Sequence, residues 1–385
     1  MFRDNQMGVY IHWPFCAAKC PYCDFNSHVR GDFDQKQWAD AYLKSLEFYA
    51  NLLPDKQVVS VFFGGGTPSL MKPETVRVII DKIQMLWPSV NDVEITLEAN
   101  PTSVEMGKFI EFRSAGVTRI SLGVQALKNE DLKFLGREHS VDEAFKAIEI
   151  ADECFERYSF DLIYGRPDQS LNDWEQELTR AMPYARGHMS LYQLTIERNT
   201  PFYMQYNRGE FSIPDDVKGA DFYHITQDVM ENYGMPSYEV SNHAELGQEC
   251  RHNMVYWNMA DYIGVGAGAH GRFVNGDCKY ATRDHSAPEV WLKRVQEKGN
   301  GSHDFEQLSS DDRCVEAIMM GLRLREGISV KRCDDLSGAN FYSIVDDKKL
   351  RTICESGWAT FSGDNLSLTR EGLLRLNAII SFIIQ

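Results

Sequence analysis

The sequence has no apolar stretch long enough to cross a bilayer and no apolar leader at its start. No run approaches the ~20 apolar residues that a membrane-spanning helix needs, and the opening residues Met1-Phe-Arg-Asp-Asn-Gln6 are too polar for a secretory signal. We therefore expect a cytoplasmic protein, with peripheral membrane association through partners left open.

Basic charge is also in short supply. The chain has 40 Lys and Arg against 56 Asp and Glu, a formal net charge of −16. Nucleic-acid binding depends on Lys and Arg that neutralise phosphates, so the composition predicts no nucleic-acid partner, and docking on anionic lipid is disfavoured for the same reason. A chain of 385 residues with 43% hydrophobic content is large enough for two or three domains.

Paired cysteines are scarce. Of nine cysteines only Cys16, Cys20 and Cys23 stand close together, as C-x3-C-x2-C, and the other six are expected to be buried or idle thiols. Disulfides are disfavoured without a secretory signal. A four-ligand zinc site lacks a second cysteine pair, although His12 or His28 could join Cys20 and Cys23. Three thiolates can instead hold three irons of a [4Fe–4S] cube and leave the fourth iron open, which is the interpretation we favour.

Short apolar segments alternate with helical ones over residues 9–195. Six such β-α units imply a parallel sheet with helices outside it, and a partial (β/α)6 barrel of the TIM type fits the pattern. Thr102-Ser-Val-Glu105 has the form of a capping box at a helix start. The predicted strands are Val9–His12, Val58–Phe63, Val93–Glu98, Arg119–Val124, Ser159–Tyr164 and Met189–Thr195.

The alternation within these strands places three polar side chains inside the barrel. Glu98, Gln125 and Asp161 are out of phase with the apolar residues around them. Glu98 and Gln125 come at the carboxyl ends of their strands, the rim where barrels of this type carry active sites. Each alone fits a solvated strand end, but three converging on one interior favour a site. The glycines of Gly64-Gly65-Gly66-Thr67, after the second strand, let the backbone approach a ligand closely, a weak signal by itself.

The chain divides into three parts. Residues 1–200 form the predicted barrel, residues 201–304 a barrel extension and connecting region, and residues 305–385 a small α+β domain of winged-helix-like type, with a hairpin turn at Ser362–Asn365. Within the connecting region, the glycine-rich stretch Gly264–Gly271 lacks a surrounding βαβ unit, so we interpret it as close packing and not as a dinucleotide site.

The segment His252-Asn253-Met-Val-Tyr256-Trp257 allows two interpretations. Histidine is a common axial ligand of haem iron. A buried histidine that is fully hydrogen-bonded is nevertheless the more frequent outcome for an isolated one.

The segment from Tyr10 to Phe25 resembles the radical S-adenosylmethionine (SAM) superfamily, and more narrowly its branch of oxygen-independent coproporphyrinogen III oxidases and HemW haem chaperones. The resemblance implies the partial barrel and a [4Fe–4S] cluster on Cys16, Cys20 and Cys23 whose open iron is chelated by SAM. It also implies that H-N-x-x-Y-W, and His252 in it, belongs to a haem site. The positions that match cofactor contacts are Tyr10, Tyr22, Gly65, Gly66, Thr67, Glu98, Gln125, Arg137 and Asp161.

The resemblance leaves two functions open, a porphyrinogen-decarboxylating oxidase and a haem-delivering chaperone. The oxidase pattern carries another cysteine where this chain has Phe25, and only nine residues precede Tyr10 where the oxidase has a long extension. Together with the HNxxYW motif, these differences favour the chaperone, without coproporphyrinogen oxidase activity. The expected partners are haem, haem-accepting proteins such as membrane-bound respiratory enzymes, and a reductant such as flavodoxin or ferredoxin. Whether one or two SAM molecules bind stays open.

Overall fold

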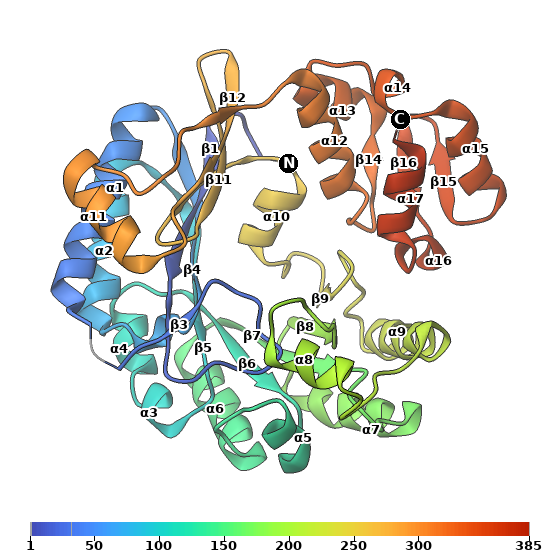
Figure 1. Ribbon diagram of the computed structural model, residues 1–385, viewed down its shortest axis with the longest axis horizontal. Helices are drawn as coiled ribbons and strands as arrows, with labels where there is room; N and C mark the ends of the chain where they lie inside the picture. Colours follow the sequence, from blue (N-terminus) through green and yellow to red (C-terminus); the bar gives the residue numbers. More distant parts are fainter. Residues whose placement is uncertain (1, 32, 385) are drawn as a thin grey trace.

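The barrel is part of one continuous curved sheet. The computed structural model (Figure 1) describes residues 2–31 and 33–384, apart from the side chain at position 104. Its strand order is β13-β12-β11-β10-β1-β4-β5-β6-β7-β8-β9, and the pairs from β10 through β1 to β8 are parallel. All six predicted strands are confirmed, with slightly wider or shifted bounds: β1 (Gln6–Trp13), β4 (Gln57–Gly65), β5 (Ser89–Ala99), β6 (Arg119–Gln125), β7 (Arg157–Tyr164) and β8 (His188–Gln193).

Residues after 200 extend this sheet at both ends. On one side β10 pairs in parallel with β1, so that Val9 faces Ile263 across the pair, and an antiparallel meander follows it. On the other side a three-residue strand pairs antiparallel with β8. The added strands are β9 (Asn242–Ala244), β10 (Asp261–Val265), β11 (His270–Asn275), β12 (Cys278–Arg283) and β13 (Glu306–Gln307).

Helices cover the outer face of the sheet because their apolar sides pack on its outward-facing residues. Val9 and Ile11 of β1, for example, share one hydrophobic core with Trp38 and Tyr42 of α1. The covering helices are α1 (Gln35–Leu52), α2 (Pro73–Leu86), α3 (Ser103–Met106), α4 (Phe109–Ser114), α5 (Asn129–Phe134), α6 (Val141–Cys154), α7 (Leu171–Ala181) and α11 (Pro288–Lys298).

The capping box expected at Thr102 and Glu105 is wrong. The Thr102 side chain makes no capping hydrogen bond at the start of α3. The Glu105 carboxylate turns away and accepts hydrogen bonds from the Asn100 amide, at 2.6 Å, and from the Ser69 hydroxyl. Glu105 therefore ties the end of β5 to the loop after β4.

Three helices of the connecting region lie near the open side of the barrel: α8 (Pro201–Asn207), α9 (Asp216–Asn232) and α10 (Arg251–Trp257). In Figure 1, α10 lies between the barrel strands and the C-terminal domain. Its first turn is fixed to the barrel because the Glu94 carboxylate accepts the Arg251 amide at 2.8 Å and also pairs with Arg157 at 2.5 Å.

The C-terminal domain has a hydrophobic core separate from that of the barrel, joined by Tyr223 and Met259 of the connecting region, and a three-stranded sheet in the order β14-β16-β15. The predicted hairpin is confirmed, and the chain ends in two short helices, the first of which Thr369 caps. The elements are α12 (Ser310–Gly321), β14 (Ile328–Ser329), α13 (Val330–Ser337), α14 (Phe341–Ile344), α15 (Asp347–Glu355), β15 (Ala359–Ser362), β16 (Asn365–Leu368), α16 (Arg370–Leu373) and α17 (Leu376–Ile383).

Candidate iron–sulfur and cofactor site

The three clustered cysteines surround one small cavity at the carboxyl end of the barrel. Cys16 ends the short strand β2 (Phe15–Cys16), and Cys20 and Cys23 follow in the loop that leads to β3 (His28–Val29). All three line a cavity of ≈170 Å³, the thiol cavity. Burial raises the pKa of the Cys16 and Cys23 thiols.

The cysteine loop is held in place by residues far away in the chain. Asn26 donates one side-chain hydrogen bond to the Ala267 carbonyl at 2.8 Å and another to the Ser286 carbonyl at 2.9 Å. The Asn26 carbonyl in turn lies 2.9 Å from Nε2 of His12. These contacts position the thiols relative to the sheet without using any of the three sulfurs.

The glycine-rich loop packs on the cysteine strand. A Cβ atom at Gly66 would lie 2.5 Å from the Phe15 carbonyl oxygen, and one at Gly65 would lie 2.6 Å from the His12 ring. The amides of Gly66 and Thr67 donate to the carbonyls of Trp13 and Phe15 at 2.7 and 2.8 Å. The three loop residues do line the thiol cavity, but the glycines are required by the neighbouring strand. Close packing on the cysteine strand is therefore sufficient to explain the glycines, which agrees with the weak signal that they gave in the sequence.

Two carboxyl groups lie on the barrel interior beside this cavity, as the strand alternation predicted. Burial, helped by the charge of Asp161, raises the pKa of Glu98 to about 8, and burial raises the pKa of Asp161 to about 6. Gln125 ends β6 in the left-handed region, at φ 71°, and also lines the cavity. When ionised, the carboxylates of Glu98 and Asp161 can accept hydrogen bonds from a cationic or amine ligand.

Arg137 links the cysteine loop to the barrel. Its Nη1 lies 3.4 Å from the Cys20 sulfur, and its Nη2 donates to the Gly123 carbonyl at 2.9 Å and to the Asn100 side chain. Asn100 was not among the predicted site residues, yet it lines the thiol cavity. Its place two residues after Glu98, just beyond the strand end, was the only signal for it in the sequence.

The two predicted tyrosines lie in different places. Tyr22 lines the thiol cavity. Tyr10 does not line it. Tyr10 lines a separate polar space of ≈180 Å³ inside the barrel, which we call the lumen chamber. The Tyr10 hydroxyl lies 3.0 Å from Nδ1 of His12. Glu98 and Asp161 line both spaces.

His252 also lines the lumen chamber, and both of its ring nitrogens are engaged. Nδ1 lies 2.8 Å from the Ser60 hydroxyl, and Nε2 lies 2.7 Å from the Tyr256 hydroxyl. Burial lowers the pKa of His252 to about 3, so the ring is neutral. In this arrangement the first and fifth residues of HNxxYW hold α10 against β4.

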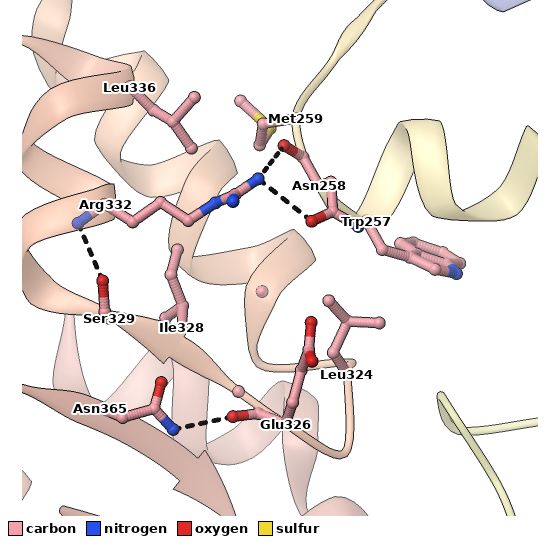
Figure 2. Close-up of a pocket in the computed structure, with 12 residues that line it drawn as sticks. Trp257, Asn258, Met259, Leu324, Glu326, Ile328, Ser329, Arg332, Leu336 and Asn365 are labelled. Carbon is pink, nitrogen blue, oxygen red and sulfur yellow. Dashed lines mark hydrogen bonds between the residues drawn. The ribbon is translucent and has the colours of Figure 1, made fainter. Parts of the chain in front are cut away.

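Two further cavities adjoin these residues. The wide cavity, of ≈540 Å³, shares Tyr22, Glu98 and Asp161 with the thiol cavity and reaches Leu374 of the C-terminal domain. The interdomain cavity, of ≈300 Å³, begins at Trp257, the last residue of HNxxYW. Figure 2 shows Arg332 of α13 crossing it to the Asn258 side-chain and main-chain oxygens, at 3.1 and 2.9 Å.

The residues around the thiol cavity suit an iron–sulfur cluster with one open iron. Three thiols converge there, beside carboxyl, amide and cationic side chains and the ring of Phe25. Within residues 2–31 and 33–384, no three His, Cys, Asp or Glu side chains gather tightly enough for a single metal ion. A cluster bound at its corners spans more space than one ion. Three thiols at the end of a partial parallel barrel are the arrangement that the resemblance to radical SAM proteins implied.

Comparison with known proteins agrees with this class. The profile of the Radical SAM superfamily matches residues 10–181, and that of the HemN C-terminal domain matches residues 308–375. The solved structure of coproporphyrinogen III oxidase (HemN) from Escherichia coli has a TM-score of 0.82 at 21% identity, covering 98% of this chain and 90% of that one. This similarity confirms the predicted fold.

Two relatives narrow the family. The heme chaperone HemW of Escherichia coli (strain K12) is 34% identical over 388 residues, which cover 100% of both chains. The mitochondrial radical S-adenosyl methionine domain-containing protein 1 of Danio rerio is 35% identical over 386 residues, 98% of this chain and 87% of that one. The chain therefore belongs to the radical SAM superfamily and, within it, to the family of the HemW haem chaperones. Membership implies a [4Fe–4S] cluster and SAM. No helix of the described residues is long and apolar enough to span a membrane.

Proposed function

We propose that this protein is a haem chaperone that carries a [4Fe–4S] cluster and SAM and delivers haem to acceptor proteins. The observation that carries the proposal is similarity to HemW along the whole of both chains. Phe25, which stands where the oxidase pattern has a cysteine, supports it: the side chain lines both the thiol cavity and the wide cavity, and it offers an aromatic face there in place of a thiol.

The cofactor assignment follows from the thiol cavity. Cys16, Cys20 and Cys23 would hold the cluster, and its open iron would bind SAM. Tyr22, Glu98, Gln125, Arg137 and Asp161 would orient the cofactor. Tyr10 lies below them, so its role would be to hold His12 and, through it, the cysteine loop. His252 would support α10. The acceptors, membrane-bound respiratory enzymes among them, and the reductant are parts of the same proposal.

The test is a pair of assays on protein purified without oxygen and reconstituted with iron and sulfide. Ferric haem titrated into the protein should give a saturable absorbance change, and the bound haem should pass to apomyoglobin as a probe acceptor. The same sample, given SAM, dithionite and coproporphyrinogen III, should leave the porphyrinogen unchanged. Porphyrinogen decarboxylation at catalytic turnover would replace the chaperone assignment with the oxidase.

A further inference from the structure

The cavities described above differ in how well their volumes suit a large flat molecule such as haem. The inference drawn from this difference rests on the proposed haem function. Sites that enclose drug-sized ligands measure ~300–1,000 Å³. The lumen chamber with His252, at ≈180 Å³, is below that range, and the interdomain cavity, at ≈300 Å³, is at its lower limit. The wide cavity, at ≈540 Å³, lies well within it.

The walls of the wide cavity are apolar and come from three parts of the chain. Ile163 and Leu191 line it from the ends of β7 and β8, and Leu374 lines it from the C-terminal domain. Phe25, on the cysteine loop, is 60% exposed at the same cavity. A side chain this apolar and this exposed gains free energy if a flat ring covers it.

The polar lining of the cavity includes four acids and four tyrosines, together with amide and hydroxyl side chains and Cys23, which is assigned to the cluster. Asp24, Glu98, Asp161 and Glu197 line it, and among its described lining residues none carries an imidazole or a thioether. The acids that are ionised attract the positively charged core of ferric haem and repel the two propionates. The macrocycle would therefore enter by the edge that carries no propionate, with its propionates at the mouth of the cavity.

Tyr192, at the end of β8, lines this space. It is 41% exposed although it lies inside the barrel, because it lines both the wide cavity and the lumen chamber. A tyrosine oxygen is a known ligand of haem iron. We propose that ferric haem binds in the wide cavity with the Tyr192 oxygen as its axial ligand. On binding, an Fe–O bond forms and the phenol proton passes to solvent, while the iron stays ferric.

The experiment compares Tyr192→Phe with Tyr206→Phe, a control on the exposed surface of α8 with nearly the same exposure, 40%. Wild type and the control should bind ferric haem with the absorbance and electron paramagnetic resonance spectra of high-spin, oxygen-ligated iron. Tyr192→Phe should lose that signature and bind about tenfold more weakly or worse. Circular dichroism and cluster absorbance should be the same in all three proteins.

Two further experiments test the orientation of the bound haem and the location of its site. Haem dimethyl ester, which has no propionate charge, should bind wild type as tightly as haem does or more tightly. Thr195→Trp, which adds an indole at an exposed lining position, should reduce haem binding.

The outcomes separate the site from the function. If wild type binds no haem, the chaperone proposal fails. If wild type binds haem but Tyr192→Phe keeps the spectrum, or His252→Ala alone abolishes it, the chaperone stands and the wide-cavity site is overturned. Low-spin nitrogen-ligated haem in wild type would overturn it as well.

Discussion

Binding of SAM should release a proton from Glu98. The carboxyl has a pKa of about 8 in the unliganded protein, because burial and the charge of Asp161 raise it. At pH 7 about nine-tenths of the molecules are therefore protonated at Glu98. If the ammonium or sulfonium charge of SAM binds beside this carboxyl, the ionised form is favoured and the proton leaves.

The magnitude follows from the pKa. Ionising Glu98 at pH 7, one unit below its pKa, costs about 1.4 kcal/mol, which weakens SAM binding about tenfold relative to pH 9. The Glu98 contribution should be about 0.9 protons released at pH 7 and about 0.1 at pH 9. Glu98→Gln keeps the shape of the side chain and removes this contribution.

Isothermal titration calorimetry without oxygen, in buffers of different ionisation enthalpy, measures the protons released. Any proton from the SAM amino group appears in both proteins, so the difference between wild type and Glu98→Gln isolates Glu98. Equal proton release in the two at pH 7 would show that SAM does not bind beside this carboxyl.

The same shift has a consequence for stability. The folded pKa of Glu98, about 8, lies above the ordinary value of 4.5. The contribution of Glu98 is therefore fully present below pH 4.5 and is lost as the pH rises through about 8. Unliganded wild type should lose melting temperature over that interval, and Glu98→Gln should lose less. A parallel decline in both would contradict the assignment.

Three other predictions concern the framework. Replacing Cys20 with Ala should remove or convert the reconstituted cluster, seen as lost visible absorbance, whereas Cys154→Ala should leave it intact. Gly66→Val should disturb the cysteine strand, because its side chain would meet the Phe15 carbonyl; a normal cluster and an unchanged melting temperature would contradict this. Arg166 forms a buried ion pair with Glu177. Arg166→Met should lower the unfolding free energy by ~3–5 kcal/mol in denaturant titrations, because it leaves the buried Glu177 carboxylate without its cation. A change below about 1 kcal/mol would refute this prediction.

The six barrel strands could be predicted because each is a local apolar segment with a clear period. The strand β10 could not, since Gly264 lowers its strand propensity and its partner β1 lies some 250 residues earlier. Gly264 is required there because a Cβ would lie 2.1 Å from the His270 carbonyl oxygen. Long-range pairing of this kind leaves no periodic signal in the sequence.

The functional site likewise has local features that the sequence predicts and long-range contacts that it does not. The cysteine spacing and the inward phase of Glu98 and Asp161 are local, so they were predictable. The contacts of Asn26 and His252 depend on which distant segments meet. Asn26 bonds to Ala267 and Ser286, and His252 bonds to Ser60. For His252, the sequence showed only a histidine in a motif, and the structure shows where its two nitrogens are engaged.

The hydrogen bond from Asn26 to Ser286 spans 260 residues of the chain, which has a consequence for synthesis. At ~5–20 residues per second, a ribosome needs roughly 13–52 s to make the intervening segment. During that time β1 can pair with β4, but the cysteine loop lacks its later anchor. The three thiols are then held from one side only, while the nascent chain is still growing. A cluster inserted at this stage would meet a loop that has not yet made its hydrogen bonds to Ala267 and Ser286.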